Sequence, residues 1–404
     1  MKNKVLTGLL LVLIGGWGSL SAQSAGSNYS RQVNTLIGTK GVGLTSGYLY
    51  PGATYPYGMV QFTPSYFSKR SGFVINQLSG GGCEHMGNFP TFPVKGKLKM
   101  SPDNILNYRI NISEEKGHAG YYEAMVQEDI KAKLTVTERT GMASYEYPAD
   151  QQYGTVIIGG GISATPIEQA AIVITAPNKC EGYAEGGNFC GLRTPYKVYF
   201  VAEFDTDALE SGTWKRNELK PNTTFAEGEY SGVYFTFDVN KKKNIQYKIG
   251  VSYVSVENAR ENLKAENTGW DFLQIQNQAE SKWNHYLGKI EVEGTNPDRT
   301  TQFYTHLYRS FIHPNVCSDV NGEYMGADFK VHKSRSKHYT SFSNWDTYRT
   351  QIQLLSILDP EVVSDIVISH QLFAEEAGGA FPRWVMANIA VSYTHLTLPT
   401  KLEV

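Results

Sequence analysis

The sequence predicts a protein with two parts, a β-sandwich in the first half of the chain and an all-α domain in the second half. Between about residues 30 and 256, short runs of β-branched and aromatic residues alternate with Gly, Asn, Asp and Pro, which is typical of a sandwich. After about residue 257 the apolar residues recur at steps of three and four, which is typical of helices. A chain of 404 residues is long enough to fold into two domains.

The first half contains several short segments with the properties of strands. Residues 133–147 alternate between apolar and polar side chains, as a half-buried strand does. Strands this short and this closely spaced favour two packed sheets, so residues 28–256 are predicted to form the sandwich domain. Four further runs are rich in β-branched and aromatic residues, namely "TVIIGG" (155–160), "YKVYFVAEF" (196–204), "GVYFTFDV" (232–239) and "IQYKIGVSYVSV" (245–256).

Residues 270–288 carry the clearest helical pattern. Gly288 is a typical C-terminal stop for this helix. We predict that residues 257–295 form a helical linker that follows the sandwich. The apolar face of the helix comprises Phe272, Leu273, Ile275, Ala279, Trp283, Tyr286 and Leu287.

Two further helices are marked by their first residues. Asn296 is a good cap and Pro297 suits the first helical position, and Asp359 with Pro360 repeats this arrangement. A helical domain is therefore predicted from residue 296 onward. The apolar face of its first helix comprises Phe303, Tyr304, Leu307 and Phe311.

The N-terminus has the composition of a secretory signal peptide. Lys2 and Lys4 form a charged start, residues 5–14 form a short apolar core, and small residues near Ala22 offer a cleavage site. The apolar run is too short and too interrupted by Gly for a membrane span. We interpret residues 1–22 as a signal peptide and expect an exported protein, either periplasmic or extracellular.

Charge and aromatic content exclude some functions and leave others open. With 37 basic and 39 acidic residues, the chain lacks the basic excess that binders of nucleic acid or anionic membranes need. Aromatic residues make up 12 % of the chain, and Tyr is the most frequent of them with 26 copies. Tyr and Trp offer flat apolar faces with a polar edge, which suits carbohydrate binding. However, β-rich proteins use many aromatic residues in any case.

Four cysteines follow the signal peptide: Cys83, Cys180, Cys190 and Cys317. An exported chain can form disulfides, and four cysteines allow three pairings. Cys180 and Cys190 flank a Gly-rich segment that a disulfide between them could close. Four buried free thiols are the alternative, and the sequence leaves the choice open.

A glycine-rich stretch, "LSGGGCEHMGNFPTFP" (78–93), is the first candidate for ligand contact. Its three consecutive glycines allow backbone N–H groups to approach a ligand closely. This is not a phosphate-binding loop, because the Lys and Ser/Thr that follow the glycines of that motif are absent here. A catalytic pair of Cys83 and His85 is disfavoured, because the two residues are close in sequence and no third group orients them. A ligand-contacting loop and a purely structural turn remain open.

An acidic stretch, "SDVNGEYMGAD" (318–328), hints at a calcium-binding loop. The closing Glu of an EF-hand is absent, so the spacing does not fit that motif. Asn321-Gly322 is a strong signal for a tight hairpin turn, and we predict a hairpin here.

The stretch "SFSNWDTYR" (341–349) places an indole, a carboxylate, a phenol and a guanidinium between Trp345 and Arg349. If Thr347 begins the helix that follows, Trp345 and Asp346 lie at its mouth, where an indole and a carboxylate would bind a monosaccharide. Asp346 could equally cap that helix, and the residue pattern alone favours the cap.

Taken together, these stretches resemble glycoside hydrolase family 92, the calcium-dependent α-mannosidases. The resemblance covers about residues 30–389 and follows the order of the family's motifs. The matching motifs are "VNTLIGT" (33–39), "PGATYPYGMVQFTP" (51–64), "LSGGGCEHMGNFP" (78–90), "FCGLRTPYKVYFVAEF" (189–204), "FYTHLYRSFIHPNVCSDVNGEYMGAD" (303–328), "SFSNWDTYRTQIQLLSILDPE" (341–361) and "GGAFPRWVMAN" (378–388).

The resemblance implies an N-terminal β-sandwich docked on an (α/α)6 barrel, of which residues 296–390 would be the start. It implies inverting exo-hydrolysis of terminal α-linked mannose in mannan or N-glycans, and we expect the α-1,2 linkage. It also implies Ca²⁺ as a cofactor, with ligands that remain unknown, and an α-mannoside oligosaccharide or glycan as the partner. The substrate-binding residues implied by the matching motifs are Gly81, Gly82, Cys83, Glu84, Trp345 and Asp346.

The chain departs from the family in its last part. Inverting hydrolysis needs two carboxyl groups, and the family motifs that supply them, an "EGN" type and a "GNDDxG" type, are both absent. The residues "SYTHLTLPTK" (392–401) resemble a translated adapter sequence, so we interpret 391–404 as a non-native tail on a C-terminally truncated chain. We assign no catalytic residue and expect the chain as given to be inactive. A non-catalytic exported mannose-binding protein is the alternative.

Overall fold

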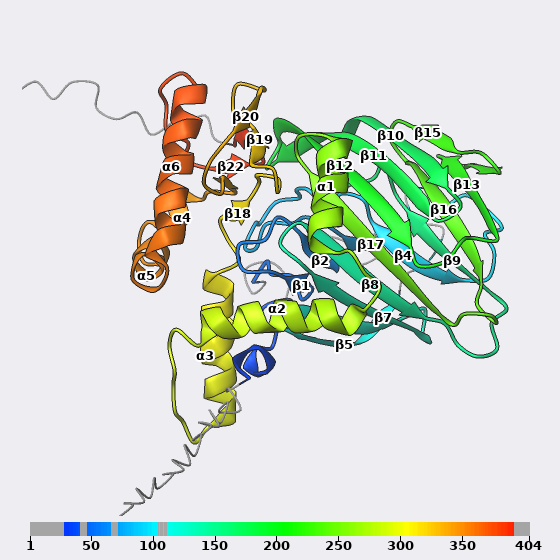
Figure 1. Ribbon diagram of the computed structural model, residues 1–404, viewed down its shortest axis with the longest axis horizontal. Coiled ribbons are helices and arrows are strands. Elements are labelled where there is room, and N and C mark those ends of the chain that lie inside the picture. The colour runs from blue at the N-terminus through cyan, green and yellow to red at the C-terminus, as the bar shows by residue number, and fades with distance from the viewer. Residues whose placement is uncertain are drawn as a thin grey trace, which may run out of the picture.

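Figure 1 shows the computed structural model, in which a large β-sandwich carries helices along one side. The structure describes residues 28–40, 47–65, 72–103, 105, 108 and 111–391. The predicted signal peptide lies outside these residues, as does the predicted tail apart from Val391. A single 3-10 turn, η1 (Tyr29–Gln32), opens the described chain. No helix within the described ranges is both long enough and apolar enough to cross a membrane.

The sandwich consists of two sheets whose paired strands run antiparallel. The eight-stranded sheet has the order β1 (Ala53–Thr54), β2 (Gln61–Pro64), β3 (Phe73–Val74), β4 (Thr91–Lys95), β9 (Tyr153–Ile158), β16 (Ser231–Asp238), β13 (Glu210–Lys215) and β14 (Glu218–Pro221). The nine-stranded sheet has the order β15 (Phe225–Glu227), β10 (Ile167–Ala176), β11 (Lys179–Phe189), β12 (Leu192–Phe204), β17 (Asn244–Ser252), β8 (Thr140–Glu146), β7 (Ile130–Val136), β6 (Tyr121–Val126) and β5 (Ile112–His118).

The main hydrophobic core lies between these sheets, because alternate residues of each strand point inward. Across this core the rings of Phe204 in β12 and Phe235 in β16 lie 4.9 Å apart. The β-rich first half that the sequence predicts is therefore confirmed. The inward positions of β12, each at most 3 % exposed, are Tyr196, Val198, Phe200, Ala202 and Phe204.

Two helices cover the outer face of the nine-stranded sheet (Figure 1). α1 (Val256–Glu266) packs Ala259 and Leu263 against Val201, an outward-facing residue of β12. α2 (Phe272–Leu287) lies across β7 and β8. Both helices of the segment predicted as a linker thus pack on the sandwich.

α2 follows the sequence prediction closely. It ends at the predicted position, where the N–H of Gly288 donates to the carbonyl of Asn284 at 2.9 Å. Trp283 is buried and its Nε1 donates to the Thr54 carbonyl at 2.6 Å. Leu273 is an exception: it was expected on the apolar face, but its side chain is 64 % exposed, since it points away from the sheet.

The second half is mainly helical, as predicted, but it is not all-α, because its described residues also form short two-stranded sheets. The predicted helix caps are confirmed only in part. α3 (Pro297–Ser310) begins as expected, because Asn296 Oδ1 accepts the N–H groups of the two residues after Pro297, at 3.0 and 3.2 Å. α6 (Pro360–Glu376) also begins at its predicted proline. However, the side chain of Asp359 does not cap α6, and its Oδ1 lies 3.4 Å from Lys289 Nζ instead. Asp359 therefore occupies the predicted N-cap position, but its side chain does not supply the hydrogen bond of a cap.

Short elements complete the second half. α4 (Asn344–Thr347) and α5 (Gln351–Leu358) precede α6. Three two-stranded sheets pair β18 (Asn315–Val316) with β21 (Tyr339–Thr340), β19 (Glu323–Met325) with β20 (Val331–Lys333), and β22 (Val385–Met386) with β23 (Ile389–Ala390). The described helices do not close a ring, and the (α/α)6 barrel stays a prediction.

The predicted hairpin turn at Asn321-Gly322 is misplaced. These residues do form a tight turn, in which the N–H of Gly322 donates to the Asp319 carbonyl at 2.9 Å. However, the hairpin of β19 and β20 is closed by residues 326–330, at its other end. The Asn-Gly signal therefore marks the entry to the hairpin rather than its tip, because local turn preference does not fix which strands pair.

A second core of aromatic residues joins the sandwich to the helices. Tyr57, from a loop of the eight-stranded sheet, makes edge-on ring contacts with Tyr286 of α2, Phe311 after α3 and Tyr339 of β21, at centroid distances of 5.7, 6.0 and 6.1 Å. All four residues are at most 8 % exposed. Burying this much aromatic surface stabilises the junction between the two halves.

The helices α5 and α6 leave part of their apolar surface open. A cavity of about 480 Å³ lies between them, with Phe342, Leu355 and Ile366 in its lining. Ile357 is 79 % exposed and Val367 is 59 % exposed.

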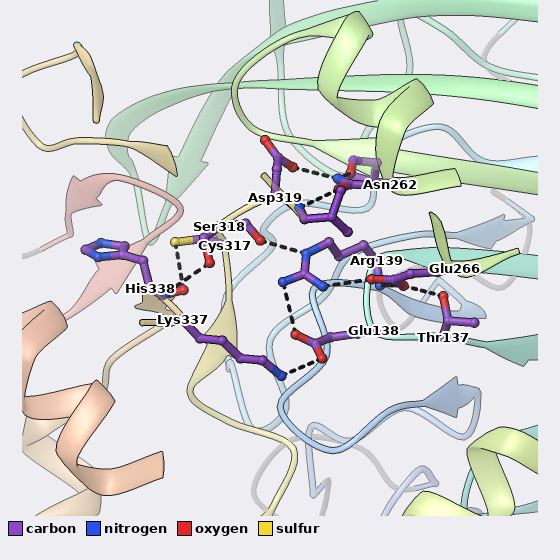
Figure 2. A network of polar contacts seen from close by, with 12 residues as sticks. Thr137, Glu138, Arg139, Asn262, Glu266, Cys317, Ser318, Asp319, Lys337 and His338 are labelled. Carbon is purple, nitrogen blue, oxygen red and sulfur yellow. Dashed lines mark hydrogen bonds and ion pairs between the residues drawn. The ribbon is translucent and has the colours of Figure 1, made fainter. Parts of the chain in front are cut away.

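A buried polar network ties three separate parts of the chain together (Figure 2). Arg139, in the loop between β7 and β8, donates from Nη1 to Glu266 at the end of α1 (2.7 Å) and from Nε to the Ser318 carbonyl after β18 (2.7 Å). Its Nη2 lies 3.2 Å from Glu138 Oε1, and Glu138 pairs in turn with Lys337 Nζ at 2.7 Å. Arg139 is only 7 % exposed. Burial disfavours its cation, but the carboxylates of Glu138 and Glu266 outweigh this and raise its pKa.

Asp319 extends the network on the side of α1. Asn262 Nδ2 donates to Asp319 Oδ1 at 2.6 Å, while Asn258 Nδ2 and Ser252 Oγ donate to Oδ2 at 2.8 and 2.7 Å. Burial raises the pKa of Asp319, although these hydrogen bonds act in the opposite direction. The sandwich, α1 and the segment after β18 are therefore held in one arrangement by groups that would be costly to leave unpaired.

Replacing Arg139 tests this junction. Arg139→Ala leaves the largely buried Glu266 without its cation, while Glu138 keeps its ion pair with Lys337. We therefore expect the change to lower the free energy of unfolding by about 3–5 kcal/mol. The exposed pair of Arg216 and Glu229, 3.6 Å apart, supplies a control, and Arg216→Ala should cost less than about 1 kcal/mol. Urea unfolding measures both, and equal effects of the two changes would contradict the assigned role of Arg139.

Candidate functional site

A cavity of about 250 Å³ lies where the sandwich meets the second half of the chain. One wall is the loop between β3 and β4, and the other is formed by segments around α3, α4 and β22. The cavity is lined by residues 78–81, 309, 313, 314, 341–343, 346, 347, 351, 384 and 385. Gly81 and Asp346, two residues predicted to contact a sugar, are thus brought together from opposite walls.

The glycine-rich loop needs glycine at two of its three consecutive positions, for different reasons. Gly80 has a φ of +85°, a left-handed conformation that favours glycine. A Cβ at Gly81 would lie 2.6 Å from the ring of His85, so only glycine allows this close approach. Gly82 is exposed, and a Cβ there would meet nothing nearer than the Tyr48 ring at 3.9 Å.

Two neutral histidines hold the backbone of this loop. His85 Nε2 accepts the N–H of Leu78 at 2.8 Å, so the proton lies on Nδ1, which donates to the Cys83 carbonyl at 2.7 Å. His313 Nε2 accepts the N–H of Ser79 at 2.8 Å, and its Nδ1 donates to Asn315 Oδ1 at 2.6 Å. Burial lowers the pKa of both histidines to about 4. Each therefore stays an acceptor at neutral pH.

A disulfide anchors the same loop to the sandwich. It joins Cys83 to Cys190, at the turn between β11 and β12, with a Cα–Cα distance of 5.2 Å. The suggested pairing of Cys180 with Cys190 is wrong, because Cys180 points into the sandwich core and is fully buried as a free thiol. Cys317 is also a free buried thiol. As a disulfide, Cys83 has no thiolate to act as a nucleophile.

The opposite wall carries Asp346 on the one-turn helix α4. Its Oδ2 accepts a hydrogen bond from Ser343 Oγ at 2.5 Å, and its side chain is exposed to the cavity. Asp346 does not cap the following helix, since α5 begins after Thr350 and lacks a side-chain cap. The carboxylate is therefore free to accept hydrogen bonds from a ligand.

The other predicted contacts lie outside the lining of the cavity. Trp345 is 56 % exposed, with the Arg383 guanidinium 4.0 Å from its ring centroid. Glu84 is exposed to solvent on the sandwich side, and Gly82 and Cys83 follow the part of the loop that lines the cavity. Their sugar-binding roles stay predictions.

Most lining residues were not predicted from the sequence, and three of them have large polar or aromatic side chains: Arg309, His313 and Trp384. Arg309 donates to the Thr35 and Tyr50 carbonyls at 2.7 and 3.1 Å, which are far away in the sequence. The Trp384 ring packs 5.4 Å from Phe189, next to the disulfide. Trp384 and His313 fall in stretches that matched the family, but no local pattern shows which side chains of such a stretch face a cavity.

The lining offers few ligands for a metal ion. Among the described residues around the cavity, Asp346 is the single carboxylate, whereas Ca²⁺ takes about six to eight oxygen ligands, usually with several carboxylates. The expected Ca²⁺ does not fit this set of donors alone.

Replacing the glycines separately tests their assigned roles. Gly81→Ala should lower the free energy of unfolding by about 1–3 kcal/mol, since His85 must move and release the loop. Gly82→Ala, the matched control, should stay within about 0.5 kcal/mol of the natural protein. Denaturant unfolding distinguishes them, and a neutral Gly81→Ala would show that the His85 contact does not constrain the loop.

The histidines also predict a pH dependence. Their pKa is about 4 in the folded state against an ordinary value of 6.5, so the unfolded state binds more protons between these values. The free energy of unfolding is therefore unaffected by these two histidines above pH 6.5, and it decreases as the pH falls toward 4. The slope of the free energy of unfolding against pH gives the number of protons that the chain takes up on unfolding. We expect His313→Gln to reduce this number by about one in this pH window. Denaturant unfolding at a series of pH values measures this slope. Equal slopes for His313→Gln and the natural protein would contradict the role of His313.

Comparisons with known proteins follow the division of the fold. Residues 32–252 match the model described as the glycosyl hydrolase family 92 N-terminal domain, and residues 258–394 match the one described as its catalytic domain. A curated protein of Arthroderma benhamiae, described as an uncharacterized secreted glycosidase, is 26 % identical over 363 residues, which are 80 % of this chain and 45 % of that protein.

Solved structures of α-mannosidases from the same family are also similar to this chain. A GH92 α-mannosidase from Bacteroides thetaiotaomicron is 25 % identical, with a TM-score of 0.82 over 91 % of this chain and 52 % of that chain. A further structure of that mannosidase, in complex with mannoimidazole, gives a TM-score of 0.81 at 25 % identity over 91 % of this chain and 51 % of that one. The chain spans about half the length of these relatives. Because the N-terminal family model alone follows more than half of the sequence, the chain belongs to glycosyl hydrolase family 92.

Proposed function

We propose that the cavity is the mannose-binding part of an exported, inverting exo-α-mannosidase. The observation that carries this proposal is the meeting of the Leu78–Gly81 backbone with the Asp346 carboxylate across a cavity of about 250 Å³. Family membership and the mannoimidazole complex of the Bacteroides relative support a mannoside as the ligand. The fungal relative is described as secreted, which supports export.

The residues of this cavity suit the binding of one sugar ring. Asp346 can accept hydrogen bonds from two hydroxyl groups, and charged acceptors make the stronger hydrogen bonds. Trp384 is partly buried in the lining and offers an apolar surface for the ring carbons. The loop at Gly80 and Gly81 brings the backbone close to the ligand, and the two histidines and the disulfide fix its position.

Cleavage needs more than this lining contains. An inverting glycosidase uses an acid and a base roughly 6.5–9.5 Å apart, and the described lining holds one carboxylate, Asp346. We propose that the chain as given binds a terminal α-mannoside without hydrolysing it. Hydrolysis of α-1,2-linked mannose from mannan or N-glycans, and its dependence on Ca²⁺, would require acidic groups beyond those described around the cavity.

The alternative is a mannose-binding protein without any hydrolase activity, which the single carboxylate favours. Incubation with an α-1,2-mannobiose, with and without a calcium chelator, tests whether the chain as given hydrolyses a mannoside. We expect no mannose release from the chain as given. Chelator-sensitive release would instead show that both catalytic carboxylates are present, and would contradict our reading of the cavity.

Binding of mannoimidazole tests the site directly. Asp346→Asn removes a charged acceptor, so we expect the Kd to rise about 10-fold or more, in line with about 1.5–3 kcal/mol for hydrogen bonds to charged groups. The control is Asp150→Asn, which changes an exposed residue in the turn between β8 and β9 and should leave the Kd unchanged. Calorimetry measures the Kd of both variants. Equal Kd values for the Asp346 variant and the natural protein would contradict the proposed role of Asp346.

A further inference from the structure

A second cluster of potential ligands lies away from the sugar-binding cavity. Asp328 in the β19–β20 turn, His332 in β20 and Glu376 at the end of α6 each offer one donor atom, and the three atoms lie within 4.8 Å of one another. They face a cavity of about 720 Å³. None of the residues that line this cavity also lines the cavity with Asp346.

The local backbone is shaped so that these three side chains can converge. A Cβ at Gly326 would lie 2.6 Å from the His332 ring and 2.8 Å from both Asp328 Oδ1 and Glu376 Oε2. Any other residue at position 326 would therefore push the three groups apart. The carbonyl of Gly326 is fixed by Asn388 Nδ2 at 3.1 Å.

The carboxylate of Glu376 is oriented toward the cluster by neighbours. Tyr324 OH donates to Oε1 at 2.7 Å, and the N–H of Ala327 donates to Oε2 at 2.9 Å. Such hydrogen bonds to a carboxylate are typical of the partners that orient metal ligands. Each carboxylate oxygen keeps a second lone pair for a cation.

The charge at this place is incompletely balanced. Glu376 has a side-chain exposure of only 8 %, and within the described chain the single basic group in ion-pair range of it is His332, at 4.0 Å. Asp328 is paired through Oδ2 with Lys330 at 3.4 Å, while its Oδ1 lies 2.9 Å from His332 Nε2. A carboxylate as buried as Glu376 is costly without a cation beside it.

We propose that Asp328, His332 and Glu376 bind a divalent cation of the Zn²⁺ or Mn²⁺ type. An imidazole nitrogen with two carboxylate oxygens suits these ions, whereas Ca²⁺ prefers oxygen ligands throughout. The cation would replace the direct contact between Asp328 Oδ1 and His332 Nε2. It would link the β19–β20 hairpin to the end of α6, and the remaining coordination positions would face the cavity and water.

Calorimetric titration of the tag-free, chelator-stripped protein with Zn²⁺ alone tests this proposal. We expect one Zn²⁺ per chain and a 10-fold or greater rise in Kd for His332→Gln and for Asp328→Asn. His306→Gln changes an exposed histidine on α3 and should bind Zn²⁺ as the natural protein does. Circular dichroism without metal shows whether each variant is folded, and either folded variant suffices for the comparison.

A second measurement fixes the class of ion. Mn²⁺ alone should lose its free six-line electron paramagnetic resonance signal on binding to the natural protein, and much less with His332→Gln. Absence of Zn²⁺ binding, or binding that the Asp328 and His332 variants leave unchanged, would overturn the site. Displacement of Zn²⁺ by an equal concentration of Ca²⁺ would overturn the assignment to Zn²⁺ or Mn²⁺.

Discussion

The buried guanidinium of Arg139 is the contact on which the geometry of the molecule depends most. Arg139 lies in the β7–β8 loop of the sandwich, and its guanidinium donates hydrogen bonds to Glu266 of α1 and to the carbonyl of Ser318, which follows β18. One wall of the sugar-binding cavity belongs to the sandwich, and most of the other belongs to residues 341–385, which follow Ser318. A shift at Arg139 would therefore change the width of the cavity, although Arg139 does not line it.

The glycine loop shows how a flexible sequence becomes a fixed surface. Glycine allows the backbone of Gly80 and Gly81 to adopt its path, but it would also allow many others. The Cys83–Cys190 disulfide and the imidazoles of His85 and His313 select one of them. Holding a binding loop rigid before the ligand arrives reduces the entropy that binding must overcome.

Local signals in the sequence predict the elements well and the site only in part. Gly288 and Asn296 mark helix ends because a cap acts on its own neighbours, and alternating strands reveal their buried faces. The site instead depends on distant pairs: His313 meets Ser79 across 234 positions, and Cys83 meets Cys190 across 107. The resemblance to the family placed Gly81 and Asp346 on the same cavity, but could not show that Trp345 turns outward while Trp384 lines it.

A crystal structure of this chain with mannoimidazole would test the central claim most directly. Our account predicts the sugar ring between the Leu78–Gly81 backbone and Trp384, with Asp346 within hydrogen-bonding distance of its hydroxyl groups. Two results at saturating ligand would contradict the assignment of the Asp346 cavity as the mannose-binding site. One is ligand density only in the apolar cavity between α5 and α6, and the other is no ligand density in the Asp346 cavity.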